Sequence, residues 1–175
     1  MKFTLVTILA VFLTACSYPP ENIRNIRKAN IILDTRNPAY KAASYLGFTE
    51  RTHRSELRDF TGVDPVRTEW CAAFVNAVLN ESGIPGSETV SEYPLTARSF
   101  LDWGAKISKQ DIEPGDIVVF PRGNQGWQGH VGFYLKTQTI DGVEYYYILG
   151  GNQKNKVSVE LYRANKSLGI RRPSV

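Results

Sequence analysis

The sequence predicts an α+β fold in which N-terminal helices pack on an antiparallel β-sheet. Two observations lead to this prediction. Apolar residues between positions 38 and 103 follow helical spacing, in segments that end at glycine or proline, whereas residues 117–162 contain short apolar or alternating runs typical of strands. At 175 residues the chain is long enough for about one domain. We therefore expect one layer of helices on one sheet.

Four segments have helical patterns: residues 38–46, 54–60, 70–82 and 94–103. The first follows Asn37 and ends at Gly47, and the last ends at Gly104. Residues 70–82 are apolar on nearly all sides and stop before Gly83 and Pro85. A helix of that composition is expected to be buried.

The strand patterns begin at residue 117. Residues 117–120 form a continuous apolar run after the turn at 113–116, which predicts a core strand. Residues 131–135 and 145–149 flank Asp141-Gly142, a strong signal for a hairpin turn. Residues 157–162 alternate as expected of a further strand.

The first fifteen residues have the layout of an export signal. Lys2 precedes the apolar stretch 3–13, which is too short to cross a bilayer. The sequence Leu13-Thr14-Ala15-Cys16 then resembles the lipobox of bacterial lipoproteins, in which cleavage leaves Cys16 as a lipid-modified N-terminus. An ordinary signal peptide followed by an incidental cysteine is the alternative. We expect residues 1–15 to be the signal peptide, 16–36 a lipidated tether and 37–175 the catalytic domain.

The expected location is the cell envelope, with the chain held at a membrane through Cys16. Residue Ser17 is not the aspartate associated with inner-membrane retention, so the outer membrane, facing the periplasm, is expected in a Gram-negative host. The formal charge of +4 comes without a long run of lysine and arginine, which argues against nucleic acid as a partner. Two distant histidines and one remaining cysteine make no recognised metal-ligand cluster, and no cofactor is expected.

Cys71 is the second of two cysteines, and the lipobox accounts for the other. An unpaired cysteine in an exported protein is either a reactive thiol or a buried structural one. Its place in the first turn of the 70–82 helix favours reactivity, because unpaired N–H groups and the helix dipole stabilise a thiolate there. We therefore expect Cys71 to be a nucleophile.

His130 is the candidate base, because it begins a strand directly after the glycine-rich loop 123–129. An imidazole that takes the thiol proton needs a third polar group on its other nitrogen. With a two-residue turn at Asp141-Gly142, His130 lies opposite Gln153, and one bulged residue on the first strand moves Asn152 there instead. Asn152 is the expected third group and Gln153 the alternative. The other histidine, His53, is expected at the surface.

Four segments in order resemble the CHAP and NlpC-type cell-wall hydrolases: residues 69–75 (EWCAAFV), 114–120 (PGDIVVF), 129–134 (GHVGFY) and 150–153 (GGNQ). The resemblance covers about residues 37–173. It implies a papain-like fold, cleavage of an amide bond in the peptidoglycan stem peptide, and the roles of nucleophile, base and third polar group for Cys71, His130 and Asn152. NlpC-type members often have a histidine in the third position, which makes this chain more similar to the CHAP side.

Trp127 and Trp70 are candidate substrate-binding residues, since an indole stacks on a sugar or forms the wall of a cleft. Packing within the core or a loop is the alternative for both, and the favoured one for Trp70. Two other functions are consistent with the same sequence features. One is a non-catalytic envelope lipoprotein that binds peptidoglycan or a partner protein, and the other is a toxin or phage-lysis enzyme with the same chemistry.

Overall fold

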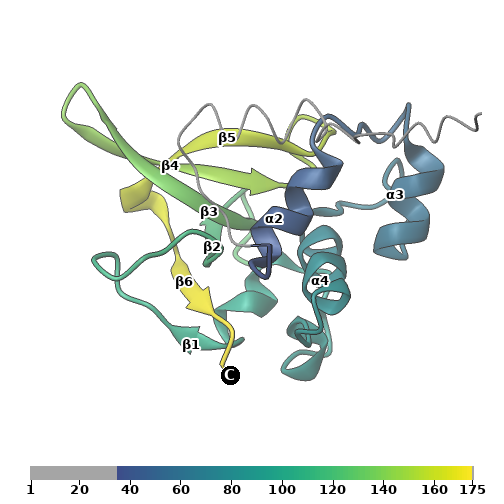
Figure 1. Ribbon diagram of the computed structural model, residues 1–175, viewed down its shortest axis with the longest axis horizontal. Helices are drawn as coiled ribbons and strands as arrows, with labels where there is room; N and C mark the ends of the chain where they lie inside the picture. The colour runs from purple at the N-terminus through teal and green to yellow at the C-terminus, as the bar shows by residue number, and fades with distance from the viewer. Residues whose placement is uncertain (1–34, 175) are drawn as a thin grey trace, which may run out of the picture.

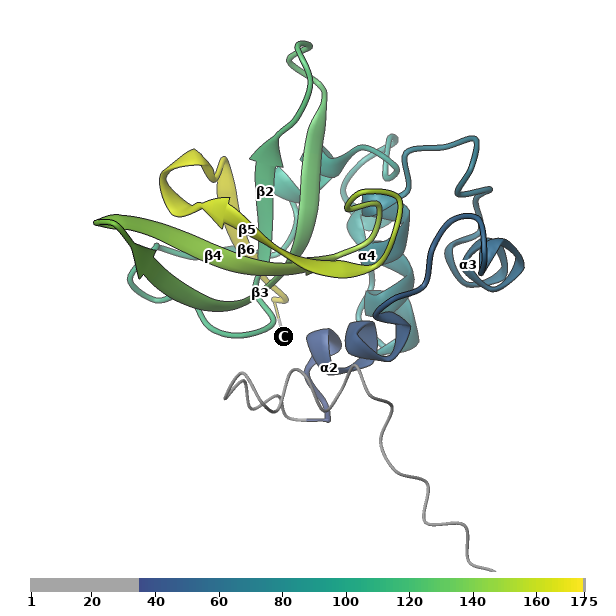
Figure 2. The ribbon, with the colours of Figure 1, turned by 90° about the horizontal axis from the view of Figure 1, so that it is seen from above.

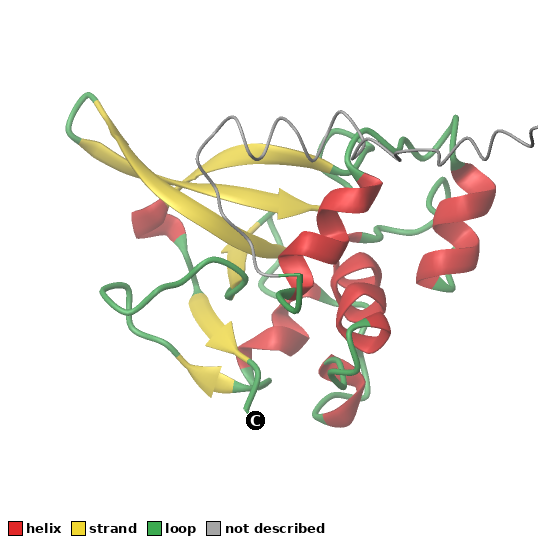
Figure 3. Ribbon diagram, viewed as in Figure 1, coloured by secondary structure: helices red, strands yellow, loops and turns green. Residues whose placement is uncertain are grey.

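The computed structural model describes residues 35–174, so the predicted signal peptide, Cys16 and nearly all of the tether lie outside the described residues. Figures 1 and 3 show helices gathered beside a strongly bent sheet. The helices are α2 (Pro38–Ala42), α3 (Arg54–Thr61) and α4 (Cys71–Glu81), with 3-10 helices η1 (Ala43–Tyr45), η2 (Ser87–Thr89), η3 (Ala97–Leu101) and η4 (Ala164–Lys166). The strands are β1 (Ala105–Lys106), β2 (Ile117–Pro121), β3 (Gly129–Ile140), β4 (Val143–Gly150), β5 (Ser158–Arg163) and β6 (Gly169–Arg172).

The predicted helices are present, with one change of type. Asn37 caps α2 by accepting a hydrogen bond from the N–H of Ala39 at 2.9 Å, and Gly62 ends α3 in the left-handed conformation. Residues 94–103 were expected to be helical throughout, but only the 3-10 helix η3 forms there, which is too short to satisfy the backbone as an α-helix does. None of the described helices is long and apolar enough to cross a membrane.

The strands form an antiparallel sheet in the order β1-β6-β2-β3-β4-β5. Strands β1 and β6 were not expected from the sequence, because both are short and carry arginine or lysine in place of an apolar pattern. Arg172 instead forms hydrogen bonds with the buried carboxylate of Asp116, at 2.7 and 2.9 Å. The predicted α+β fold is confirmed.

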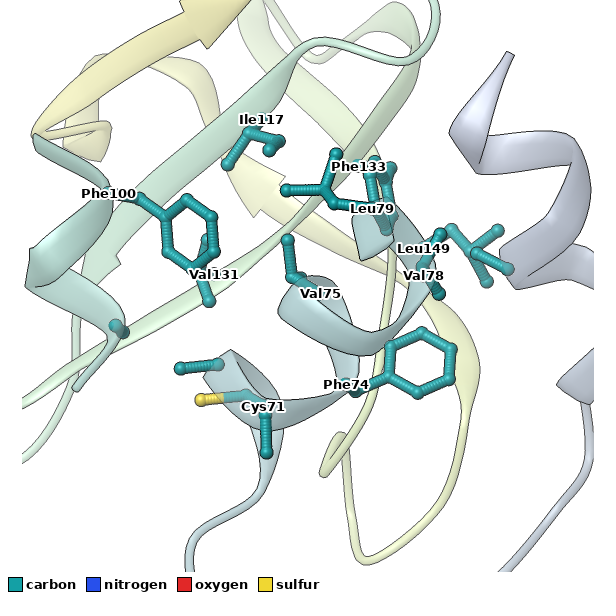
Figure 4. Close-up of a cluster of buried hydrophobic side chains, with 14 of the residues drawn as sticks. Cys71, Phe74, Val75, Val78, Leu79, Phe100, Ile117, Val131, Phe133 and Leu149 are labelled. Atoms are coloured by element: carbon teal, nitrogen blue, oxygen red, sulfur yellow. The ribbon is translucent and has the colours of Figure 1, made fainter. Parts of the chain in front are cut away.

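The core lies between α4 and the sheet. Val75 and Leu79 of α4 lie near Ile117, Val131 and Phe133 of the strands (Figure 4), and all five side chains are fully buried. The helix contacts β3, α2 and α3, and its first residue, Cys71, contacts the backbone of Val131 near the start of β3. A second apolar cluster occupies the opposite face of the sheet and includes Phe120 and Tyr146.

The β3–β4 hairpin has the predicted two-residue turn, with Ile140 opposite Val143. It also has a bulge on β3, because the register shifts between Tyr134 and Lys136. Toward the open end of the hairpin, Phe133 pairs with Leu149, and continuing this register would bring His130 opposite position 152. The bulge that the sequence analysis required for Asn152 is therefore present, but β4 ends at Gly150, before that residue.

Candidate active site

Cys71 is the first residue of α4 and lies against the beginning of β3. Its side chain is 4% exposed, and the thiol forms part of the wall of a surface cleft. Burial raises the pKa of the thiol, while the guanidinium of Arg122 and the backbone N–H groups of Val131 and Ala72 act in the opposite direction. The contact with Val131 places the sulfur beside the residue that follows His130.

His130 lies on β3 and is 1% exposed, directly behind the cleft. Its ring stacks on Tyr162, with 5.2 Å between centroids and 11° between planes, and Tyr162 in turn stacks on Phe120. Burial, followed by the positive charge of Arg122, lowers the pKa of His130 to about 3, although a hydrogen bond with Gln153 opposes the change. The imidazole is therefore neutral at physiological pH.

The side chain of Gln153 determines which ring nitrogen of His130 carries the proton. Its Nε2 donates to the backbone carbonyls of Ser158 at 2.6 Å, Ile148 at 3.2 Å and Gly150 at 3.3 Å. Because the amide nitrogen is held by acceptors, Oε1 is the atom that faces His130 Nε2, at 3.1 Å. A carbonyl oxygen only accepts, so Nε2 of the neutral ring is the donor.

The other ring nitrogen, Nδ1, is consequently unprotonated in the neutral form. It is buried and has no hydrogen-bond partner within residues 35–174. The charge of Arg122 acts on both groups and lowers the pKa of the Cys71 thiol as well as that of the His130 imidazole. The described residues thus include a thiol at the start of α4 and, on β3, a neutral imidazole whose tautomer is fixed by Gln153.

The expectation that Asn152 orients His130 is not met in this geometry. Asn152 follows the end of β4 with a φ of 55°, and its Nδ2 donates to Glu69 Oε2 at 2.6 Å. The left-handed backbone turns the side chain toward the cleft, whereas the longer side chain of Gln153 reaches back to the ring. Gln153, the alternative in the sequence analysis, holds the third position.

Arg122 connects the two walls of the cleft. Its Nη2 donates to the backbone carbonyl of Asn152 at 3.0 Å, and its Nη1 lies 3.6 Å from Glu69 Oε2. The sequence analysis did not single out Arg122, although its position at the start of the glycine-rich loop was a usable signal. Tyr162 was also missed, because an alternating strand pattern does not show which side chain will stack on a histidine.

The cleft has a volume of about 470 Å³. Its walls come from the residues before α4, the segment before η3, the β2–β3 loop and the turn after β4. The residues that line it are Glu69, Cys71, Leu95, Thr96, Ala97, Arg122, Trp127, Gln128, Gly129, Asn152, Lys154 and Asn155. Figure 2 shows the β2–β3 loop, which carries Trp127, projecting from the sheet beyond the N-terminal end of α4.

The two candidate tryptophans have different positions. Trp127 is 65% exposed at the edge of the cleft, as a substrate contact requires. Trp70 is fully buried and packs edge-on against Phe74, so the prediction that it binds substrate is wrong. Its indole instead supports the turn after β4, because a Cβ on Gly151 would lie 2.6 Å from Trp70 Cζ3.

The other histidine, His53, makes its contacts outside the candidate active site. His53 precedes α3, stacks on Phe48 at 4.2 Å and interacts through Nδ1 with Thr52 Oγ1 at 2.9 Å. It is half-buried, which is more enclosed than the surface position expected, and it does not line the cleft.

Helices on an antiparallel sheet, with a cysteine at a helix start and a histidine on a neighbouring strand, define the papain-like class of α+β proteins. The family model of the CHAP domain matches residues 63–152, just over half of the chain. The chain belongs to the CHAP domain family.

One solved structure agrees with this assignment at the level of the fold, and a second is given beside it. A Staphylococcus aureus subsp. aureus Mu50 protein described as similar to lipoprotein, NLP/P60 family, matches with a TM-score of 0.53 and 19% identity over 82% of this chain. An NLPC/P60 family protein from Bacillus cereus has a TM-score of 0.46 and 16% identity, also over 82% of this chain. This chain spans 43% and 41% of those two chains. Comparison with curated protein sequences gives no match.

Proposed function

We propose that this protein hydrolyses an amide bond of the peptidoglycan stem peptide, with Cys71 as nucleophile, His130 as base and Gln153 as the group that orients the base. The observation that carries the proposal is the hydrogen bond from His130 Nε2 to Gln153 Oε1. It leaves the lone pair of Nδ1 without a hydrogen-bond partner among residues 35–174, and in the proposed mechanism this lone pair takes the proton of the thiol at the N-terminus of α4.

The reaction proceeds by two acyl transfers. His130 Nδ1 takes the proton of the Cys71 thiol, and the thiolate attacks the carbonyl carbon of the substrate. The imidazolium returns that proton to the leaving amine as the C–N bond breaks, which leaves a thioester on Cys71. Water, deprotonated by Nδ1, then attacks the thioester, and the thiolate leaves and regains the proton. The N–H of Cys71 is the expected oxyanion donor, because the first residue of a helix has no intrahelical acceptor for it.

Burial sets the resting state of this cycle. A neutral pair, thiol and imidazole, costs less to bury than an ion pair, so the resting state is the uncharged one. The thiolate forms as the proton moves to His130, and Arg122 together with the helix terminus stabilises the negative charge. The lining of the cleft contains both acidic and basic side chains, which suits the mixed charges of a stem peptide.

The test is mass spectrometry of purified peptidoglycan incubated with the full chain in detergent, beside Cys71→Ala and His130→Gln. New fragments that require both side chains are expected, and their masses identify the bond. Circular dichroism shows whether the variants remain folded. Fragments produced equally by a folded Cys71→Ala variant would contradict the mechanism. A folded wild type that releases nothing but sediments with peptidoglycan would favour the non-catalytic binding lipoprotein.

We further propose that Cys16 is lipidated and holds the chain at the cell envelope. The support is the sequence of residues 1–16, which lie outside the described part of the structure. Fractionation of cells that express the wild type and Cys16→Ser tests this: the wild type is expected with membranes and the variant in the soluble fraction. A wild-type mass without acyl chains would contradict it.

A further inference from the structure

A second groove lies beside the cleft of Cys71, on the other side of Trp127. It has a volume of about 440 Å³ and is lined by Ser91, Tyr93, Thr96, Arg98, Ser99, Asp102 and Trp127. Thr96 and Trp127 line both hollows, so the groove and the cleft are neighbours that share these two residues. None of the steps proposed above uses this groove.

The loop that presents Trp127 is held in place by its neighbour. Gln128 Oε1 accepts hydrogen bonds from the N–H groups of Asn124 at 2.9 Å and Gln125 at 3.0 Å. The carbonyl of Gln128 accepts from Arg98 Nε at 2.9 Å, which ties the loop to η3. A large indole that is 65% exposed on a loop with these anchors is a prepared contact surface, since little conformational entropy is lost when a ligand packs on it.

Tyr93 forms the opposite side of the groove and is 71% exposed. Its backbone is held on both sides: its N–H donates to Ser91 Oγ at 3.1 Å, and its carbonyl accepts from Thr96 Oγ1 at 2.8 Å. Tyr93 and Trp127 are the exposed large aromatic side chains among residues 35–174. Both lie on this groove, which marks it as a binding surface.

The groove combines aromatic faces with polar groups of both kinds. The electron-rich face of an aromatic ring attracts C–H groups that carry partial positive charge, as those on one face of a pyranose do. The hydroxyls of Ser91 and Thr96, the carboxylate of Asp102 and the guanidinium of Arg98 provide acceptors and donors for ring hydroxyls and acetamido groups. One cationic and one anionic side chain leave no net charge to attract an ion.

We infer that this groove binds the glycan strand of peptidoglycan, with a saccharide ring packed on Trp127 and Tyr93. The inference rests on the proposed function. Because Thr96 and Trp127 line both the groove and the cleft, a substrate whose stem peptide lies at Cys71 carries its covalently attached sugar past Trp127. The enzyme then prefers glycan-linked stem peptides to free ones.

Binding is measured without catalysis, in full-length Cys71→Ala in detergent, with an N-acetylglucosamine oligomer as the probe. The tryptophan fluorescence reports on Trp127, because Trp70 and Trp103 are 0% and 4% exposed. We expect a saturable change, and Tyr93→Ala weakens the affinity about tenfold, as the loss of one aromatic contact does. Leu161→Ala is the matched control, because the Leu161 side chain is 44% exposed on β5 and lies outside the groove. This variant is expected to bind the oligomer with the same affinity as the parent.

Cleavage is measured in the enzyme with Cys71 intact, on the same stem peptide with and without its disaccharide. The ratio of kcat/KM for the linked and free peptides is expected to fall about tenfold in Tyr93→Ala and to stay constant in Leu161→Ala. Equal rates on both peptides, together with no fluorescence change, would overturn the inference and leave the hydrolase intact. Saturable sugar binding without cleavage of either peptide would instead refute the proposed hydrolysis and retain the groove.

Discussion

The Nε2 atom of His130 lies 3.1 Å from Oε1 of Gln153, in a hydrogen bond that is almost completely shielded from solvent. The direction of this bond follows from the three carbonyls that hold the amide nitrogen of Gln153. The position of one proton on His130 is thus set by the turn between β4 and β5.

Gln153→Leu should lower kcat about 100-fold, because the imidazole loses the acceptor that fixes its tautomer. Asn152→Gly is the matched variant: it keeps the left-handed backbone, removes the side chain that contacts Glu69, and should cost much less activity. Steady-state kinetics on a stem peptide compare the two. A greater loss in Asn152→Gly would restore Asn152 as the orienting group. Thermal unfolding must accompany the kinetics, since Gln153→Leu also leaves buried carbonyls unpaired.

Arg122→Gln should move the reactivity of Cys71 to higher pH. The guanidinium stabilises the thiolate and so lowers the pKa of a thiol that burial has raised, and its removal lets that pKa rise further. The measurement is the pH dependence of alkylation by iodoacetamide in a Cys16→Ser background. Lys154→Gln removes the same charge from the cleft lining, at a residue that forms an ion pair with Glu160, and should leave the curve in place. Identical shifts in both variants would indicate a general charge effect.

His130 should make the fold less stable as the pH falls. The unfolded imidazole binds a proton near pH 6.5 and the folded one near pH 3, so between these values the unfolded state holds more protons. The contribution is complete above pH 6.5 and is lost on acidification, by up to about 1.4 kcal/mol per pH unit. Denaturant unfolding at several pH values, compared with His130→Gln, isolates this slope. Parallel curves for the two proteins would show that the folded imidazole titrates normally.

Gly151→Ala should destabilise the protein by about 1–3 kcal/mol, because the new Cβ would lie 2.6 Å from Trp70 Cζ3 and 2.7 Å from Phe74 Cβ. Both neighbours are fully buried and have no free space into which to move. Gly126→Ala meets no atom within 4 Å and should change stability by less than about 0.5 kcal/mol. Urea unfolding of both variants makes the comparison. If the two variants were equally stable, the turn after β4 would be able to shift and accommodate the new Cβ at little cost in free energy.

Local patterns in the sequence were enough to predict α4, the β3–β4 turn and the α+β class. Each depends on the spacing of side chains along one segment, and α4 begins at Cys71, one residue after the predicted start. The sequence predicted a bulge on β3 only on the condition that Asn152 orients His130, and it did not give the position of the bulge. Strands β1 and β6 were missed, because their pairing is stabilised by partners far away in the sequence and not by a pattern of their own.

The sequence by itself determined the candidate nucleophile and base, since only a few residues of the right chemistry occupy the right local settings. The tertiary structure decided which neighbours serve them. Gln153 rather than Asn152 reaches His130, Trp70 is buried while Trp127 is exposed, and the charge of Arg122 acts on both the thiol and the imidazole. The physical reason is that a hydrogen bond depends on where a strand ends and on the backbone dihedral angles of the residue that follows. The strand end and these angles are fixed by packing between segments that are distant in the chain.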